Sequence, residues 1–300
     1  MFRRLRAMPY TKKKELYGLL FVLPWIIGFI LFFAKPLLTS FIYAFQNLEL
    51  TPQGLKGSFI GWENFEYAIY KDPSFIREAV NSFINMLYGV PLILVYSLFV
   101  AVMIKHKFPG RGFMRAVSFL PVIIASGVLM QILKEDVFSQ GMRGGAESVY
   151  LFAGAGMNGI LTELGLGPQL IEIFNNVISR IFDLTWRSGV QVLLFLAGLH
   201  TIPGYLYEAS SLEGARPWEQ FWKVTLPMLT PMMLLNIVYT IIDTFTDYGN
   251  GVIMMIYNTA FSQVRFGYSS ALAWLYCLAI AAFLGLVYVL LKKRIVYLKD

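Results

Sequence analysis

Long apolar runs separated by short polar segments dominate this chain. A membrane-spanning helix needs about 20 mostly apolar residues, because about 30 Å of hydrocarbon is crossed at about 1.5 Å per residue. Six runs reach or approach this length, at residues 17–45, 81–104, 113–133, 186–200, 226–247 and 269–291. The fourth is short unless it extends past Ile202 or begins in the amphipathic stretch near residues 171–181. The pattern predicts an all-α integral membrane protein with six spanning helices, and a count of five or seven also fits it.

Composition agrees with this prediction. Of the 300 residues, 57% are hydrophobic and 14% are charged, whereas a soluble domain has roughly 45–50% apolar and about 25% charged residues. An ordinary soluble enzyme is therefore excluded. The single cysteine, Cys277, cannot form an internal disulfide, and the two histidines, His106 and His200, are too few for a common Cys/His metal cage.

The positive charges, which give a net charge of +7, predict how the chain is oriented. Lys and Arg concentrate before the first run, between the second and third, between the fourth and fifth, and after the sixth. Such segments stay in the cytoplasm, so we expect both termini there. The predicted organisation is a cytoplasmic segment 1–16, a transmembrane domain 17–291 with an extracytoplasmic segment 134–185, and a cytoplasmic tail 292–300. Because the charge is spread over short flanks, nucleic acid is not an expected partner.

The N-terminal and extracytoplasmic segments each contain a pattern of their own. The first apolar run follows basic residues, as in a signal peptide, but it is too long and lacks a small-residue cleavage site, so we expect an uncleaved helix. In the segment 134–185, apolar residues recur at helical spacing from Leu170 to Ile181. This spacing predicts a short amphipathic helix at the outer face or capping the bundle.

The inner loop between the fourth and fifth runs, residues 205–231, carries the strongest signal. Apolar residues recur there at three- and four-residue steps, namely Leu212, Ala215, Trp218, Phe221 and Trp222. The steps are typical of one apolar face on a short helix. Gly214 and Pro217 favour two short helices that meet near them. Such an element suits docking against a cytoplasmic partner, but an interfacial helix that rests on the bilayer has the same pattern.

The loop resembles the EAA motif of permease subunits of binding-protein-dependent ABC importers. That motif reads E-A-A, three residues, G, nine residues, I-x-L-P. The matching positions are Glu208, Ala209, Ser210, Gly214, Val224, Leu226 and Pro227, with every gap correct. Ser210 replaces the second Ala and Val224 replaces Ile, and both changes preserve the size class. The preceding FLAGLHTIPGYLYEAS and, in the outer segment, GMNGILTELGL resemble the carbohydrate branch of this family.

The resemblance implies a type I ABC importer permease fold and a set of partners. The loop 205–227 would be a coupling helix seated on an ATPase subunit, with Glu208, Ala209, Ser210, Gly214, Leu226 and Pro227 as its coupling residues. The partners implied are a second homologous permease, two ATP-binding subunits and an extracytoplasmic solute-binding protein, in a prokaryotic plasma membrane. The chain has no G-x-x-x-x-G-K-[ST] phosphate loop, so ATP and Mg²⁺ would belong to the partner ATPases, and this chain would bind no cofactor and catalyse no reaction.

Polar residues in the fifth run indicate where solute passes. They recur at steps of three or four as Asn236, Tyr239, Thr240, Asp243, Thr246 and Asp247. A stripe of hydrogen-bonding groups suits a hydroxylated solute such as a sugar or oligosaccharide, and polar contacts between helices of the bundle would explain it equally well.

Lys35 is the basic residue inside the first run. A carboxylate near the middle of a span, such as Asp243, requires water or a cation, and Lys35 is a candidate for that cation. The alternatives for Lys35 are a structural ion pair, snorkelling to the interface and contact with an acidic sugar. A membrane-embedded enzyme and an ion-driven transporter that uses Asp243 and Lys35 are the rival functions. We expect an ABC importer permease that moves a sugar by alternating access.

Overall fold

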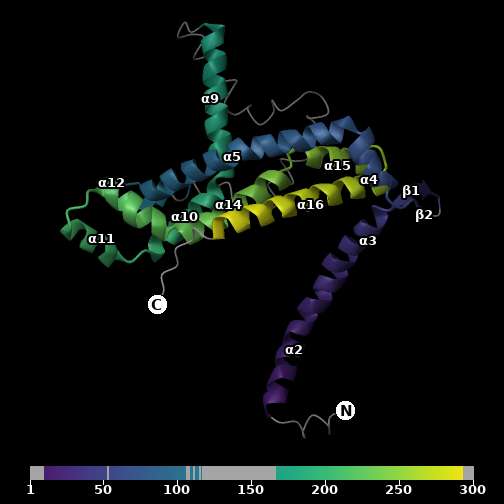
Figure 1. The fold of residues 1–300 in the computed structure, drawn as a ribbon, viewed down its shortest axis with the longest axis horizontal. Coiled ribbons are helices and arrows are strands. Elements are labelled where there is room, and N and C mark those ends of the chain that lie inside the picture. Colours follow the sequence, from purple (N-terminus) through teal and green to yellow (C-terminus); the bar gives the residue numbers. More distant parts are fainter. Residues whose placement is uncertain are drawn as a thin grey trace. The chain divides into compact units, whose positions relative to one another are not determined.

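The structure, a computed structural model, describes residues 10–52, 54–105, 109–110, 112–114, 116 and 167–292. The predicted third span, 113–133, and most of the predicted segment 134–185 lie outside these residues. The described part is mostly helical and divides into two compact units (Figure 1). Unit 1 comprises residues up to 84 together with 246–283, and unit 2 comprises residues 85–245 and those from 284 onward.

Unit 1 begins with the predicted first span. It consists of the helix α2 (Tyr10–Phe29), the π-helical turn η1 (Ile30–Ala34) and the helix α3 (Lys35–Tyr43). Pro36 has no amide hydrogen to continue an α-helical ladder, and the amide of Lys35 donates to the carbonyl of Ile30, five residues back. The π turn therefore carries the helix past the proline without ending the span.

A β-hairpin that the sequence analysis did not predict follows this span. The strand β1 (Gln46–Thr51) pairs antiparallel with β2 (Gly54–Phe59), with Glu49 opposite Lys56. Gly54 has φ +115°, which a residue with a side chain rarely adopts. The alternation in Leu48, Glu49 and Leu50 before a Pro- and Gly-containing turn was the signal for it.

The remaining elements of unit 1 pack around the end of the first span. They are α4 (Glu63–Glu66), the π turn η2 (Tyr67–Lys71), the start of α5 (Pro73–Lys105), α15 (Gly251–Phe261) and most of α16 (Phe266–Leu291). Ala44, Phe65 and Ala271 form a buried cluster. The Nδ2 atom of Asn64 donates to the carbonyls of Ala44 and Gln46 at 3.0 and 3.1 Å, which fixes the hairpin at the helix end.

A polar cluster joins the start of α5 to the start of α16 in unit 1. The hydroxyl of Tyr268 donates to Asp72 Oδ2 at 2.6 Å, and the guanidinium of Arg265 lies 4.6 Å from the centre of the Tyr268 ring. Burial opposes ionisation of Asp72, but hydrogen bonds from Tyr268, Ser74 and Phe75 outweigh it and lower the pKa of its carboxyl below the ordinary 3.8.

Unit 2 is built on the rest of α5. Its other elements are α9 (Pro168–Arg187), α10 (Gly189–Thr201), α11 (Gly204–Leu212), α12 (Pro217–Gln220), the π turn η4 (Phe221–Thr225), α13 (Leu226–Met228) and α14 (Thr230–Thr246). Its core contains Ala101 and Ile104 of α5, Phe195 and Leu199 of α10, and Leu229. Gly198 lets α14 approach, because a Cβ at this position would lie 2.6 Å from Met232 Cγ.

Two of the predicted spans are bent in the structure. Among the described residues, three helices are long and apolar enough to cross a membrane, Tyr17–Tyr43, Pro73–Lys105 and Phe266–Leu291. The pair α10 and α11 bends by 65°, and the segment Pro217–Met228 bends by 68° against α14, so these residues hold up to five spans. The helical class is confirmed. The fourth predicted span, 186–200, contains the break at Ser188 and is followed by the bend at Pro203, and the fifth, 226–247, contains the bend at Leu229.

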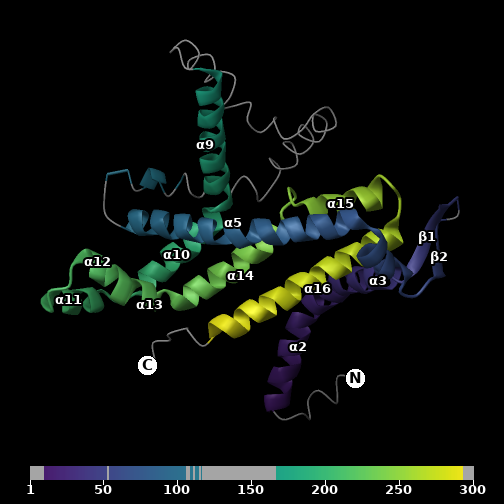
Figure 2. The ribbon, with the colours of Figure 1, turned by 45° about the horizontal axis from the view of Figure 1, so that its top comes forward.

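The predicted amphipathic helix of the segment 134–185 is present as α9. It extends to Arg187, beyond the predicted start of the fourth span at Trp186, and the helix breaks at Ser188 before α10 begins. Its apolar stripe, which includes Leu170, Phe174 and Ile181, is exposed in this chain. Figure 2 shows α9 standing crosswise to α5.

Candidate functional site

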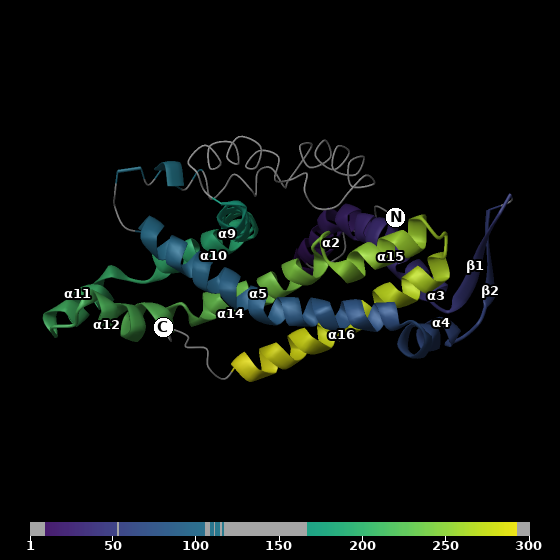
Figure 3. The same ribbon diagram turned by 90° about the horizontal axis from the view of Figure 1, so that it is seen from above.

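The EAA positions fold into a compact helical hairpin at one end of unit 2. Glu208, Ala209 and Ser210 lie on α11, Gly214 lies in the turn that follows, and Leu226 and Pro227 begin α13. Two short helices meet at the turn, as Gly214 and Pro217 predict. Figure 3 shows α11 and α12 side by side near the end of α5.

The turn after α11 explains why the motif requires glycine. The amide of Gly214 donates to the Ser211 carbonyl at 3.0 Å, and the amide of Ala215 donates to the Ser210 carbonyl at 2.9 Å. These two bonds define a Schellman motif, which places Gly214 at the position that needs a left-handed backbone. Its φ is +83°, as the motif requires.

Gln220 fastens the second half of the hairpin to the first. Its Nε2 atom donates to Ser211 Oγ at 2.8 Å, and it also lies 3.4 Å from the carbonyl oxygen of Tyr207. The amide of Arg216 donates to Glu219 Oε2 at 2.9 Å, which holds the first turn of α12. Side-chain bonds across the turn therefore make the hairpin one rigid piece.

A second set of contacts ties the hairpin to α5. The Nζ atom of Lys105, the last residue of α5, donates to the hydroxyl of Tyr207 at 3.1 Å and lies 4.4 Å from the centre of its ring. The same hydroxyl lies 3.0 Å from Thr225 Oγ1 in η4. Tyr207 thus joins a spanning helix, α11 and the segment that leads into α14. The sequence analysis missed Lys105, Tyr207 and Gln220, and no motif position marks them.

The hairpin presents large apolar side chains on its surface. Leu212 is 90% exposed and Trp218 is 70% exposed, and Tyr205 and Trp222 are also exposed. As two short helices imply, the turn at Gly214 separates Leu212 on α11 from Trp218 on α12, so these residues do not share the face of one continuous helix. Glu208 lies on the exposed surface of α11. A surface with exposed aromatic rings next to charged groups is typical of a protein-binding site.

The polar stripe of α14 divides into a buried and an accessible part. Asn236 and Thr240 are completely buried in unit 2, and Asn236 Nδ2 donates to the Gln191 carbonyl of α10 at 3.2 Å. The bond from Asn236 to α10 favours the helix-contact interpretation for Asn236, whereas Thr240 Oγ1 donates to the Asn236 carbonyl within α14 at 2.7 Å. Tyr239, Asp243 and Asp247 are only partly buried.

Gln191 and Asn236 also leave hydrogen-bonding capacity unused. The Gln191 Nε2 and Oε1 atoms and the Asn236 Oδ1 atom are buried without a hydrogen-bond partner within the described part of the chain. A buried amide without partners destabilises the state in which it is found. The contact between α10 and α14 is thus polar and incompletely satisfied.

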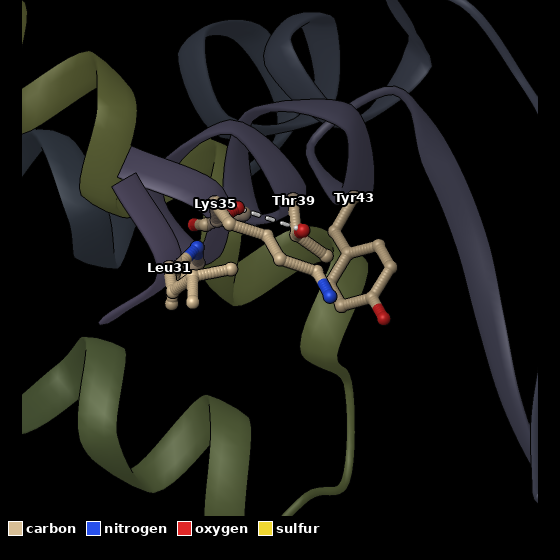
Figure 4. A pocket seen from close by; sticks show the side chains of 6 residues that line it. Leu31, Lys35, Thr39 and Tyr43 are labelled. Carbon is tan, nitrogen blue, oxygen red and sulfur yellow. Dashed lines mark hydrogen bonds between the residues drawn. The ribbon is translucent and has the colours of Figure 1, made fainter. Parts of the chain in front are cut away.

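Lys35 lies on a polar face of α3. It lines a shallow pocket of about 440 Å³ together with Leu31, Pro36, Thr39, Ser40 and Tyr43. Figure 4 shows the Lys35 side chain extending toward the ring of Tyr43, while Thr39 Oγ1 donates to the Lys35 carbonyl at 2.9 Å. Among the described residues of unit 1, Lys35 has no acidic partner, so the ion-pair alternative lacks support within this unit.

The described residues contain no group of three or more His, Cys, Asp or Glu placed to hold a metal ion.

Comparison with known proteins finds similar membrane transport components. The model of the family "Binding-protein-dependent transport system inner membrane component" matches residues 184–296, which include the whole hairpin. The "Probable ABC transporter permease protein YesP" of Bacillus subtilis (strain 168) is 29% identical over 306 residues, which cover 95% of this chain and 92% of the relative. The "Arabinooligosaccharides transport system permease protein AraP" of the same organism is 28% identical over 251 residues, or 80% of this chain and 72% of the relative.

A solved structure has the same fold. A crystal structure of a bacterial alginate ABC transporter in complex with alginate pentasaccharide-bound periplasmic protein matches with a TM-score of 0.61 and 19% identity, over 94% of this chain and 96% of that chain. The chain is thus similar to inner membrane permease proteins of ABC transport systems, an arabinooligosaccharide system among them, and the structural match shows the same fold.

Proposed function

We propose that this chain is a permease subunit of an ABC importer that moves a sugar or an oligosaccharide into the cell by alternating access. ATP hydrolysis in partner subunits drives the cycle, and this chain forms part of the path. The named relative AraP belongs to an arabinooligosaccharide system, which supports a carbohydrate as the solute class.

The geometry of the α11–α12 hairpin is the observation that carries this proposal. A small element transmits a displacement only if it is rigid and fastened to what it moves. The hairpin meets both conditions through Gln220 and through the contacts of Tyr207 with Lys105 and Thr225. We assign the coupling role to Glu208, Ala209, Ser210, Gly214, Leu226 and Pro227, with the exposed rings of Trp218 and Trp222 as the contact surface for an ATPase subunit.

Solute then passes along the accessible polar groups. We assign Tyr239 and Asp243 of α14, Asp247 directly after it and Lys35 of α3 to the path, because polar groups in a span are costly unless water or a partner meets them. Asn236 and Thr240, which the stripe also included, would act by holding α14 in place.

The assembly and topology follow from the same proposal. The chain pairs with a second homologous permease and two ATP-binding subunits, and it receives solute from an extracytoplasmic binding protein. ATP and Mg²⁺ belong to the ATP-binding subunits, and this chain binds no cofactor and catalyses no reaction. Both termini face the cytoplasm of a prokaryotic cell, with the domain 17–291 in the plasma membrane, the segment 134–185 outside and the segments 1–16 and 292–300 inside.

Transport by the reconstituted complex tests the proposal. Proteoliposomes that contain this chain, the second permease and the ATPases are supplied with the binding protein and a labelled sugar panel. We expect uptake that requires ATP, persists when ion gradients are collapsed, and is lost when the ATPases are omitted. Uptake driven by an ion gradient without ATP would assign the chain to the secondary transporters, and sugar conversion without uptake would make it an enzyme.

A further inference from the structure

A second cavity lies in unit 2, apart from every residue assigned above. It measures about 520 Å³, within the range of roughly 300–1,000 Å³ that is usual for small-molecule sites. One wall is α5, another is the C-terminal part of α9, and Thr244 of α14 completes it. The lining side chains that bear hydrogen-bonding groups are Asn85, Tyr88, Arg180, Asp183, Arg187 and Thr244.

A hydrogen bond joins the two main walls. The hydroxyl of Tyr96 on α5 lies 2.8 Å from Thr185 Oγ1 on α9. Ser188 Oγ donates to the Thr185 carbonyl at 3.0 Å, which holds the end of α9 itself.

The charges in the cavity leave one cation without a counter-charge. Arg180, Asp183 and Arg187 are spaced by three and four residues and share one face of α9. Arg187 Nε donates to Asp183 Oδ1 at 3.0 Å, so this pair is neutral as a unit. Arg180 is exposed and makes no ion pair with any residue in the part of the chain that the structure describes.

The position of the cavity argues that water reaches it. Asn85, Tyr88 and Gly89 lie within the first three turns of the expected span 81–104, near its outer end. Arg180 belongs to the segment 134–185, which the proposed topology places outside the membrane. Its guanidinium is therefore accessible to an anionic solute that arrives from outside.

We propose that this cavity is a solute-binding site and that its ligand is an acidic sugar, a saccharide with a carboxylate such as a uronate. The inference rests on the proposed importer function and specifies the solute class. The Arg180 guanidinium binds the carboxylate, since a planar fork of donors matches it in two parallel hydrogen bonds.

The other wall of the cavity suits the sugar ring. The ring of Tyr88 is 63% exposed and offers a flat apolar surface. Its hydroxyl donates to Asn85 Oδ1 at 2.7 Å, which fixes the amide so that Asn85 Nδ2 is directed as a donor for a sugar hydroxyl. Aromatic ring, amide and cation thus converge from two helices on one cavity.

Direct binding tests the site without the binding protein. The assembled complex, in nanodiscs of phosphatidylcholine, is titrated with trigalacturonic acid and with neutral galactotriose, and saturation-transfer NMR reports binding. We expect the acidic trisaccharide to bind more tightly. Replacement Arg180→Gln should raise its Kd by about tenfold, the loss expected for a charge-assisted hydrogen bond. The matched control Arg77→Gln removes an exposed arginine of α5 outside the cavity and should change neither Kd.

Three results would overturn the inference. Equal binding of the two trisaccharides is one, unchanged affinity in Arg180→Gln is another, and no binding of either by the wild type is the third. The same measurement in nanodiscs that contain phosphatidylglycerol tests whether the anion is a lipid headgroup. If this lipid is retained by the wild type but not by Arg180→Gln, and trigalacturonic acid gives no signal, the cavity binds lipid.

ATP-dependent uptake separates this inference from the proposed function. If the wild type and Arg180→Gln import galactotriose equally and neither prefers the acid, the importer function stands and the acidic ligand is refuted. If the wild type imports no sugar with ATP, the proposed function fails, and the binding measurement still decides what the cavity holds.

Discussion

Replacing Gly214 isolates the backbone requirement of the coupling hairpin. Its φ of +83° lies in the left-handed region, and a Cβ at this position would meet no atom within 4 Å. A substitution is therefore strained by its backbone and not by a clash. The series Asn, Ala and Val at this position varies that strain while the surrounding space stays open.

The magnitudes follow from the left-handed conformation. A side chain with a Cβ costs roughly 1–2 kcal/mol there, with a β-branched residue at the upper end and Asn well below it. Replacing glycine also lowers the conformational entropy of the unfolded chain, which stabilises the folded state by about 0.4–1 kcal/mol. The net loss should be close to zero for Gly214→Asn, below about 1 kcal/mol for Gly214→Ala, and between about 1 and 2 kcal/mol for Gly214→Val. The last value corresponds to a change of about tenfold in the population of the native turn.

The assay is the number of solute molecules imported per ATP hydrolysed in proteoliposomes. We expect this ratio to fall in the order Asn, Ala, Val, with the Val variant inserted in the membrane but uncoupled from its ATPase or separated from it. Co-purification of the ATPase distinguishes these two defects. Wild-type coupling in Gly214→Val would refute the coupling role. A loss in Gly214→Asn as large as that in Gly214→Val would refute the backbone explanation.

Three further predictions concern other contacts. Tyr207→Phe removes the hydroxyl bonds but keeps the ring beside Lys105, so import per ATP should fall by a few-fold, about 1 kcal/mol, and unchanged coupling would contradict the transmission role. The lowered pKa of Asp72 stabilises the fold above about pH 3.8, and protonation removes this contribution as the pH falls further. The difference in Tm between the wild type and Asp72→Asn should therefore shrink on acidification, and a constant difference would contradict the stabilising role of the ionised Asp72 carboxylate. Val264 has φ +58°, so Val264→Gly should raise Tm, because relief of about 1–2 kcal/mol exceeds the entropy cost of about 0.5–1 kcal/mol; a lower Tm would refute the strain.

The sequence predicted the features that depend on local pattern. Apolar runs of sufficient length give the helices that contain residues 17–43 and 269–291, because a spanning helix satisfies its own backbone and needs no knowledge of its neighbours. Gly214 and Pro217 predicted the break between α11 and α12 for the same local reason. The β-hairpin at 46–59 was missed because six-residue strands give a weak signal beside a long apolar run.

Long-range contacts account for what the sequence did not reveal. The periodic polar positions of α14 were correctly placed on a helix, but periodicity does not tell which of them meet a neighbouring helix. Asn236 is buried and bonds to α10, Thr240 is buried and bonds within α14, and Asp243 is only partly buried. Tyr207 and Lys105 are far apart in the chain, and only the folded structure shows that they touch.

The placement of arginines illustrates the same limit and bears on function. Counted along the chain, Arg180 and Arg187 belong to a segment outside the membrane, where cations need no explanation. In the structure the helix that carries them continues to Arg187 and lines a cavity with the centre of α5. Arg180 is there placed beside hydrogen-bonding groups of α5, so it can act with them on one ligand. The helix ends at Ser188, one residue beyond Arg187, so Arg180 lies on the part of α9 that lines the cavity. Arg180 is therefore a candidate determinant of which solute crosses the membrane.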